Sequence, residues 1–250
     1  MKNLIEEDYE ALSRRVCDCL LDTVRKDQSA VIVLPTGESP RGAYRLFVKA
    51  VKEEGLLLDG VTFIQLDEWA GIGQENPAGC GYYLKKELFE PLGISPSQWI
   101  AFRGEAQNLE EECRRVEGML EKMGKINLAL LGVGKNGHIG LNEPGDSWQI
   151  LAHPVRLTPK TLTHSMLAGE KVKPAWGLTL GIGTFFRTQQ ILLIASGPGK
   201  EEVISFFLED KVSPQYPVSI LKLHSNAVCI VEKELYQKAQ TKDSHIVNAE

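Results

Sequence analysis

The sequence predicts an α/β protein, with a Rossmann-like open, mostly parallel sheet and helices on both of its faces. Apolar runs too short for helices alternate with longer stretches of helical periodicity, which is the order of strand and crossover in a parallel sheet. Several of these runs end in glycine-rich turns, and ligands collect at such strand ends. At this length we expect residues 1–250 to form a single domain.

Composition and charge narrow the class of protein. Hydrophobic residues make up 43% and charged residues 24%, as in ordinary soluble domains. A net charge of -5 gives no overall basic footprint, so we expect no nucleic-acid partner and only a local anion site. No signal peptide and no apolar run of about 18 residues is visible, so we expect a cytoplasmic protein without a membrane partner.

The cysteines indicate reduced thiols. There are five of them, an odd number, and none forms a C-x-x-C pair. Zinc ligands are usually closely spaced cysteine or histidine clusters, so we expect no metal site.

The first two elements are predicted from periodicity. Residues from about Glu6 to Lys26 carry apolar positions at helical spacing, which indicates an amphipathic covering helix. Ala30 to Leu34 is an apolar, β-branched run typical of a buried strand. A helical pattern then continues as far as Val51.

The turn between that strand and that helix has the composition of a phosphate cradle. It holds Thr36, Gly37 and Ser39, with Pro40 suited to the first helical turn. Free N–H groups and the helix dipole would favour an anion there. Taken alone, Ser39 could equally be a simple helix cap.

The next strand predicted is Val61 to Leu66, and it runs into the carboxylates Asp67 and Glu68. Two carboxylates at a strand end can serve as acid or base, or can be solvated turn residues. A glycine-punctuated loop follows at 71–81, then a helix at 82–89 and a further helix at 109–123, which Asn108 would cap.

The central motif follows a short buried strand at 127–131. Four glycines, Gly132, Gly134, Gly137 and Gly140, allow the backbone to turn sharply and to approach a bound group closely. The titratable residues here are His138 and Glu143.

The remaining chain continues the alternation. We expect a short helix from Thr158 and an apolar run at 176–180. A strand at 190–196 then ends in Gly-Pro-Gly-Lys200 before a helix at 201–208. A lysine at such a turn suits a phosphate, although it can also be simply solvated. Apolar runs at 218–223 and 227–231 close the pattern, and the polar tail from Glu234 should begin as a helix and then fray.

Five motifs in order resemble the glucosamine-6-phosphate deaminase/isomerase family over nearly the whole chain. They are Leu34-Pro-Thr-Gly-Glu-Ser-Pro40, Leu66-Asp-Glu-Trp69, Leu131-Gly-Val-Gly-Lys-Asn-Gly-His-Ile-Gly-Leu-Asn-Glu-Pro-Gly145, Leu178-Thr-Leu-Gly-Ile-Gly183 and Gly197-Pro-Gly-Lys200. Within the family, the Asp-Glu-Trp, Lys-Asn-Gly-His and Leu223-His-Ser-Asn226 variants look most like galactosamine-6-phosphate isomerases.

The resemblance implies a reaction on a 2-amino-2-deoxyhexose 6-phosphate that uses no cofactor. The sugar ring opens, a proton moves from C2 to C1, and ammonia leaves a ketose 6-phosphate. His138 would shuttle the ring-opening proton, for which an imidazole is suited near pH 7. Glu143 would orient that imidazole. Asp67 matches the base that reaches both carbons.

The resemblance also implies the substrate contacts. Thr36, Gly37, Glu38 and Ser39 would hold the phosphate, Glu38 through its backbone only, and Lys200 would supply charge. The other substrate-binding residues expected are Glu68, Gly134 and Gly137, with Glu68 supporting its loop or binding the substrate indirectly.

Two positions depart from the glucosamine enzymes. Asn136 stands where they have aspartate before Gly-His, so it joins the catalytic cluster as an amide that cannot share a proton. A phosphate-binding arginine is missing around residues 163–167, and Arg41, His164 or Lys173 are the candidates to replace it.

The alternatives left open are a glucosamine-6-phosphate deaminase, a 6-phosphogluconolactonase and a non-catalytic sugar-phosphate sensor. The Asn142-Glu-Pro144 segment favours the isomerase over the lactonase. The epimer at C4 is not readable from sequence, since it depends on which side chain faces the 4-hydroxyl. We expect a small-molecule sugar phosphate as partner and a monomer or small homo-oligomer.

Overall fold

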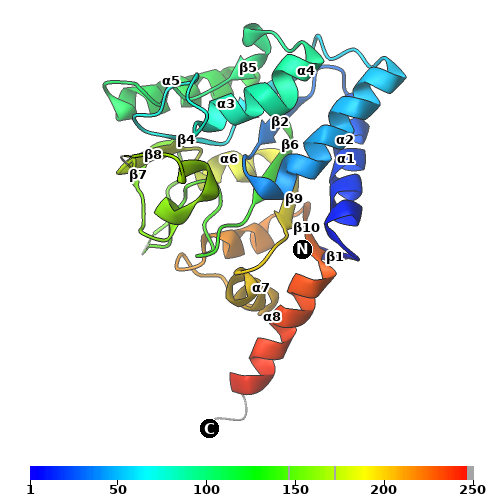
Figure 1. Ribbon diagram of the computed structural model, residues 1–250, viewed down its shortest axis with the longest axis vertical. Coiled ribbons are helices and arrows are strands. Elements are labelled where there is room, and N and C mark those ends of the chain that lie inside the picture. Colours follow the sequence, from blue (N-terminus) through cyan, green and yellow to red (C-terminus); the bar gives the residue numbers. More distant parts are fainter. Residues whose placement is uncertain (146, 172, 247–250) are drawn as a thin grey trace.

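The computed structural model describes residues 1–145, 147–171 and 173–246, and it has the open α/β fold that the sequence predicts (Figure 1). Its main sheet has seven strands in the order β1-β10-β9-β6-β2-β3-β5, and every neighbouring pair runs parallel. The strands of this sheet are β1 (Lys2–Glu6), β2 (Val31–Leu34), β3 (Thr62–Gln65), β5 (Trp99–Ile100), β6 (Ile126–Gly132), β9 (Thr188–Ala195) and β10 (Ala227–Glu232).

Helices cover both faces of this sheet because its strand residues point alternately to two cores. Val31 and Val33 of β2 belong to one core, whereas Ile32 and Leu34 belong to the other. The second of these cores is closed by α1 (Tyr9–Lys26), α2 (Glu38–Glu54) and the continuous segment of α3 (Cys80–Leu84), the π-helical η1 (Lys85–Phe89) and α4 (Glu90–Leu92). The first is closed by α5 (Leu109–Met123), α6 (Ile182–Phe186), α7 (Glu201–Leu208), the 3-10 helix η5 (Pro217–Leu223) and α8 (Lys233–Ile246).

A second, smaller sheet lies beside the first and was not predicted. It consists of β4 (Asp67–Trp69), β8 (Trp176–Thr179) and β7 (His153–Arg156), paired antiparallel in that order. Residues 67–69 are therefore a buried strand and not a solvated turn. Three residues are too few to show a period, so only the pairing with β8 defines this strand.

Three further predictions needed correction. The first helix begins at Tyr9, capped by Asp8, because the preceding residues form β1 against β10. The helix expected from Thr158 is only two short 3-10 turns, η3 (Thr161–Thr163) and η4 (Ser165–Leu167). The apolar run at 218–223 is η5, and Pro217, which fits a first helical turn, precedes it. The predicted fraying after Ile246 lies outside the described residues.

The sheet has one topological switch point, between β2 and β6. From β2 the chain adds β3 and β5 on one side, and it then crosses to β6, β9 and β10 on the other. A crevice forms at the carboxyl edge of such a point because the two connecting loops leave in opposite directions. This edge is where the predicted phosphate loop and the central glycine loop begin.

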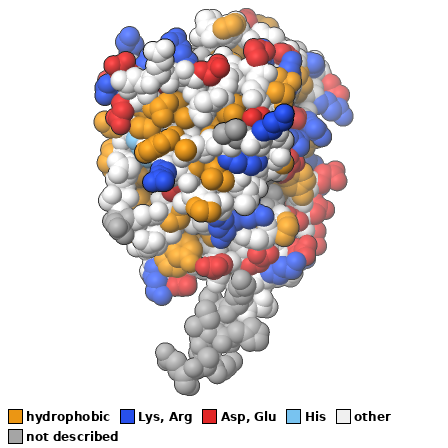
Figure 2. Space-filling view, turned by 60° about the vertical axis from the view of Figure 1, so that its left-hand side comes forward, with side chains coloured by type: hydrophobic (Ala, Val, Ile, Leu, Met, Phe, Trp, Pro, Cys, Tyr) orange, Lys and Arg blue, Asp and Glu red, His pale blue; other side chains and the backbone are white. Residues whose placement is uncertain are grey.

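On the face shown in Figure 2, acidic, basic and apolar side chains are interspersed. Across the described part of the chain, no helix is long and apolar enough to cross a membrane.

Candidate active site

A cavity of about 840 Å³ opens at the switch point, and five separate segments of the chain supply most of its lining. They are the turn after β2, strand β4, the glycine loop after β6, the η3–η4 segment and the turn after β9. Most of the predicted site residues therefore meet in one place. Among the described residues, no three histidine, cysteine, aspartate or glutamate side chains converge closely enough to hold a metal ion.

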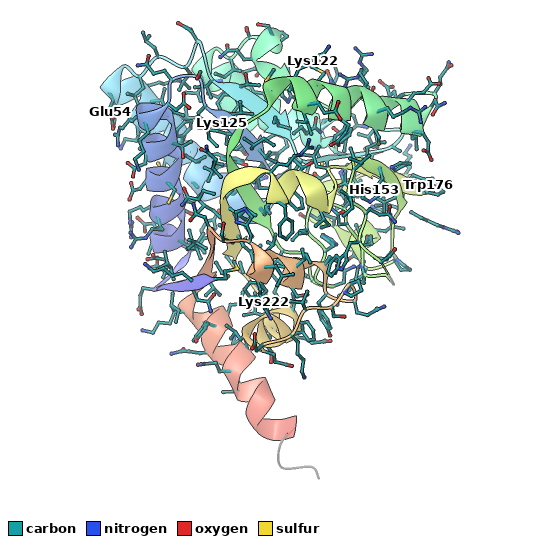
Figure 3. All side chains as sticks on the ribbon, turned by 180° about the vertical axis from the view of Figure 1, so that it is seen from behind. Glu54, Lys122, Lys125, His153, Trp176 and Lys222 are labelled. Atoms are coloured by element: carbon teal, nitrogen blue, oxygen red, sulfur yellow. The ribbon has the colours of Figure 1, made fainter. Side chains whose placement is uncertain are left out.

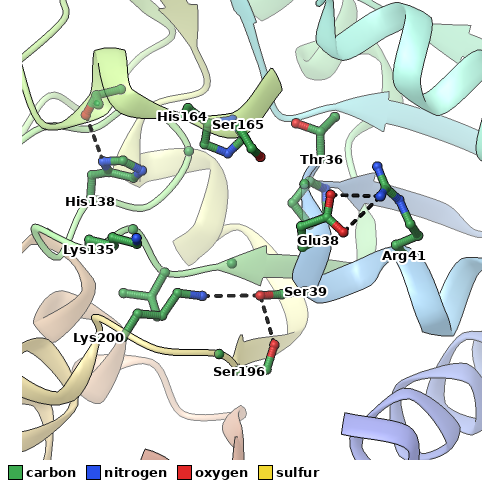
Figure 4. Close-up of a pocket in the computed structure, with 18 of the residues that line it drawn as sticks. Thr36, Glu38, Ser39, Arg41, Lys135, His138, His164, Ser165, Ser196 and Lys200 are labelled. Carbon is green, nitrogen blue, oxygen red and sulfur yellow. Dashed lines mark hydrogen bonds and ion pairs between the residues drawn. The ribbon is translucent and has the colours of Figure 1, made fainter. Parts of the chain in front are cut away.

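The turn after β2 leads directly into the N-terminus of α2. Gly37 precedes the helix with φ of 105°, a conformation that favours glycine. Two buried tyrosines fix this turn, because Tyr83 donates to the Gly37 carbonyl and Tyr44 to the Pro35 carbonyl, each at 2.7 Å. The Glu38 side chain points away to Arg41, which leaves only its backbone at the turn (Figure 4). The turn thus presents a rigid helix N-terminus to the cavity.

Lys200 reaches this turn from the other side of the switch point. Its ammonium donates to the Ser39 hydroxyl at 3.2 Å, and Ser196 donates to the same oxygen at 3.1 Å (Figure 4). Burial, and then the positive charge of Lys135, lower the pKa of Lys200 to about 8. A phosphate bound here would place a negative charge beside Lys200 and would favour its protonated form.

Asp67 is the buried acid of the cavity. Its side chain is almost fully enclosed in β4, yet it lines the cavity. Burial, with the neighbouring Glu68 charge, raises the pKa of Asp67 to about 7, and a hydrogen bond from the Cys80 thiol partly opposes this rise. A carboxyl group that titrates near neutrality is suited to both taking up and giving back a proton.

Glu68 does not contact the cavity, so of its two expected roles the structure favours support of the loop over binding of the substrate. It is completely buried, and its carboxylate accepts backbone N–H groups of Trp69, Cys80 and Gly81 at 2.8–2.9 Å. Gln65 donates a fourth hydrogen bond at 2.8 Å. Adjacent strand residues face opposite ways, so Asp67 and Glu68 cannot both reach the ligand. Glu68 instead ties β4 to the start of α3.

His138 and Glu143 form the second titratable group. Nδ1 of His138 lies 3.7 Å from the Glu143 carboxylate and 3.3 Å from the Thr161 hydroxyl. Asn136 contacts both residues, since its amide donates to Glu143 at 2.7 Å and its oxygen accepts the backbone N–H of His138 at 3.3 Å. Burial alone would raise the pKa of Glu143, but hydrogen bonds from His138, Thr161 and Asn136 lower it to about 2.

The amide of Asn136 donates to Glu143 without adding a second negative charge to the pair. An aspartate at 2.7 Å from Glu143 would place two carboxylates in contact, and they would have to share a proton. With an amide donor, Glu143 stays ionised beside the imidazole.

The two predicted glycine contacts differ in kind. Gly134 lines the cavity, and a Cβ there would lie 2.2 Å from Nε2 of His138, so its role is to make room for the imidazole. Gly137 does not line the cavity, which corrects its prediction as a substrate contact. It has φ of 87° and lies against Tyr216, where a Cβ would come within 3.1 Å of the ring.

The structure distinguishes the three candidates for the missing cation. Arg41 is already ion-paired with Glu38 at 2.8 Å and with Glu87 at 3.1 Å. Lys173 donates to the Leu167 carbonyl. His164 faces the turn after β2, because a Cβ built on Gly37 would lie 3.6 Å from its Nε2.

The tautomer of neutral His164 follows from its surroundings. Its Nδ1 accepts the Met166 N–H at 3.3 Å, so the proton of the neutral ring is on Nε2, directed at the turn. Burial, and then the charges of His138, Lys200 and Lys135, lower the pKa of His164 to about 4.

The cavity residues that the sequence did not predict include Lys135, Cys80 and Thr161. Lys135 was within the quoted central motif, and its position next to Asn136 was the available signal. Cys80 and Thr161 gave none, because a lone cysteine or threonine in a loop has no recognisable spacing.

Comparison with known proteins agrees with this geometry. The family described as glucosamine-6-phosphate isomerases/6-phosphogluconolactonase matches residues 5–230. A protein of Escherichia coli K12 that is provisionally described as the deaminase AgaI is 38% identical over 90% of this chain and 89% of its own. Glucosamine-6-phosphate deaminase 1 of Bacillus subtilis is 34% identical over 94% of this chain and 98% of its own.

Solved structures show the same fold. A monomeric glucosamine-6-phosphate deaminase superposes with a TM-score of 0.89 at 33% identity, over 95% of this chain and 100% of the other. A 6-phosphogluconolactonase of Trypanosoma cruzi, 16% identical, shares the fold with a TM-score of 0.75 over 94% of this chain and 96% of its own. The chain therefore belongs to the glucosamine-6-phosphate isomerase/6-phosphogluconolactonase family, and it is an enzyme of the isomerase/deaminase type.

Proposed function

We propose that the chain converts galactosamine 6-phosphate and water to tagatose 6-phosphate and ammonia. The observation that carries the proposal is the meeting of three features in one cavity. They are a buried carboxyl group with a pKa near 7, a histidine paired with a carboxylate, and a helix N-terminus with a lysine beside it. The helix N-terminus and its lysine suit the phosphate of a phosphorylated sugar. The buried carboxyl group and the histidine–carboxylate pair suit an internal proton transfer.

In this proposal the phosphate binds at the turn of Thr36, Gly37, Glu38 and Ser39. Lys200 supplies a positive charge, and His164 takes the place of the missing arginine, because its Nε2–H is directed at the turn. Binding at one end of the cavity holds the sugar carbons towards β4 and the central loop.

Ring opening is assigned to His138. The imidazole moves a proton between the hydroxyl at C1 and the ring oxygen, and Glu143 stabilises the charge that it carries meanwhile. Asn136 keeps Glu143 ionised for this role.

Asp67 is assigned the carbon-to-carbon step. Its carboxylate removes the proton at C2, which leaves an enolamine, and the protonated acid returns the proton to C1. Water then adds at C2 of the resulting imine, and ammonia leaves. A single acid with a pKa near 7 can perform both halves because neither protonation state is strongly favoured.

The galacto epimer is favoured by the sequence variants of the motifs, while the gluco epimer is favoured by the names of several relatives. The discriminating assay measures ammonia release from galactosamine 6-phosphate and glucosamine 6-phosphate side by side, with hydrolysis of 6-phosphogluconolactone as a third reaction. We expect kcat/KM to be highest for the galacto epimer. A preference for the gluco epimer would move the assignment there, and silence on both would contradict a deaminase.

The catalytic assignment of Asp67 has its own test. In D₂O the wild-type enzyme should exchange the C2 hydrogen of the substrate, and Asp67→Asn should not, although it should still bind inorganic phosphate. Exchange that persists in Asp67→Asn would remove Asp67 from the base role.

We also propose a monomer that works in the cytoplasm. One solved relative is described as monomeric, and all five cysteines of this chain are unpaired thiols, as in a reducing compartment. Light scattering of the purified protein tests the first point.

A further inference from the structure

Lys135 is a cation of the cavity for which the reaction above has no use. It lies in the loop after β6, and its side chain is exposed at the mouth of the cavity. An exposed lysine is ordinarily only solvated. Three observations distinguish this one.

The first observation is the support of its stem. The turn after β9 passes beneath Lys135 with Gly199 at φ of 85°, and a Cβ at Gly199 would lie 3.3 Å from Cε and 3.5 Å from Nζ of the lysine. The absence of a side chain at Gly199 therefore lets the Lys135 stem lie along the turn that carries Lys200. Both amines point to the same side in Figure 4.

The second observation is the lack of a counter-ion. Within residues 1–145, 147–171 and 173–246, no carboxylate lies within 4.0 Å of the Lys135 ammonium. Glu232, the acidic residue at this end of the cavity, accepts the Gly197 N–H at 3.2 Å.

The third observation is that the ammonium groups of Lys135 and Lys200 lie near one another, beside a neutral His164. The charge of Lys135 disfavours the protonated form of Lys200. Such a group of like charges is relieved by a bound anion, and more by a dianion than by a monoanion.

We propose that Lys135 is a second ammonium ligand of the substrate phosphate and selects the dianionic form of that group. The inference deepens the proposed function and rests on it for the identity of the sugar. The phosphate then sits between two lysines, Lys135 and Lys200, with the N-terminus of α2 on its third side.

The test uses the full chain with Lys135→Gln, its conservative partner Lys135→Arg, and Lys122→Gln as matched control. Lys122 is an exposed lysine in the last turn of α5 and is labelled in Figure 3, outside the residues that line the cavity. The readouts are kcat and KM for galactosamine 6-phosphate, and the Kd of inorganic phosphate and of inorganic sulfate by calorimetry.

We expect Lys135→Gln to raise KM and the phosphate Kd about tenfold, as loss of one charge-assisted hydrogen bond at an exposed site would, with a smaller change in kcat. The sulfate Kd should rise by a similar factor, because sulfate is also a dianion near neutral pH. The loss for inorganic phosphate should be smaller at pH 5.5, where the monoanion predominates, than at pH 8.5. Lys135→Arg should retain most of the affinity, and Lys122→Gln should match the wild type.

Other results would overturn the inference. KM and phosphate Kd within twofold of wild type in Lys135→Gln would show that the lysine is only solvated. A fall in kcat alone would place it at the reacting carbons. If the wild type turns over neither amino-sugar phosphate while Lys135→Gln still weakens phosphate binding, the proposed function fails and the phosphate ligand stands.

Discussion

Asp67 and Glu68 show how one peptide bond separates two chemical roles. Both carboxylates are buried in β4, and burial raises the pKa of each. Glu68 is surrounded by four hydrogen-bond donors that compensate its charge, whereas Asp67 faces the cavity. The first holds the local structure, and the second is free to exchange a proton.

Cys80 tunes the acid that would act as base. Its thiol accepts a hydrogen bond from Thr36 at 3.4 Å and donates to the Asp67 carboxylate, which favours the ionised form. The thiol thus connects Thr36, in the turn after β2, to Asp67. Its own pKa is raised well above the usual value by burial, so it stays protonated and remains a donor.

Cys80→Ala should therefore move the acidic limb of the pH profile. In the proposed reaction Asp67 must be ionised to accept the C2 proton, so kcat/KM should fall as the pH drops through about 7. Loss of the thiol raises the pKa of Asp67, and kcat/KM at pH 6 should fall about two- to fivefold, as loss of a hydrogen bond of ~0.5–1 kcal/mol would produce. At pH 8.5 it should approach wild type. Cys19→Ala, on α1, is the control, and an equal loss at both pH values would contradict the tuning role.

At the scale of elements, the loop after β6 is shaped by the imidazole that it carries. Gly134 accepts the Gly137 N–H at 3.0 Å through its carbonyl and donates its own N–H to the His138 carbonyl at 2.9 Å. The turn closes tightly enough that the imidazole lies over Gly134 itself. The glycine here provides space and not an unusual φ, since its φ is not positive.

Gly134→Ala should consequently impair catalysis more than folding. The added methyl group would lie 2.2 Å from Nε2 of His138 and must displace the ring. A displacement of about 1 Å can lower kcat/KM by roughly 100-fold. Steady-state kinetics and thermal unfolding of the variant measure the two effects.

Gly118→Ala is the matched control for that variant. Gly118 lies in α5, and nothing is within 4 Å of a Cβ placed there. Alanine should stabilise the helix by about 0.5–1 kcal/mol and leave kcat/KM unchanged. Normal kinetics in Gly134→Ala would show that the imidazole does not need its present position.

For the whole molecule, the ionised form of buried Asp67, which the proposed reaction uses, lowers the stability of the fold. The pKa of Asp67 is raised in the folded state, so folding favours the protonated form. The stability that protonated Asp67 gives is complete below its unfolded pKa of about 3.9. It is lost progressively as the pH rises and is gone above about 7.

Asp67→Asn should therefore stabilise the protein in a pH-dependent way. Asparagine cannot ionise, so the gain in Tm over wild type should be larger at pH 8.5 than at pH 5.5, by an amount on the order of several degrees. Differential scanning calorimetry at the two pH values measures it. Asp59→Asn, at an exposed turn, controls for the change of residue type. A gain that does not depend on pH would contradict burial as the origin of the raised pKa.

Elements that carry a local period could be predicted from the amino-acid sequence. Strand β2, strand β6 and helices α5 and α7 lie where alternation, apolar runs and caps placed them, because their signal is contained within one segment. The sequence also named Asp67, His138, Glu143, Ser39 and Lys200, which lie together in the structure because parallel strands end at the same edge.

Which of the candidate residues face one another depends on the folded chain. Ser39 and Lys200 are 161 positions apart, and no period connects them. The pairing of β4 with β8 forms only on folding, and it buries Glu68 away from the cavity. The ion pairs of Arg41 with Glu38 and Glu87 also form only on folding, and they leave His164 as the candidate that replaces the missing arginine. Charge, burial and free volume depend on distances between such segments, so the raised pKa of Asp67 and the place of Lys135 beside Lys200 could be read only from the folded chain.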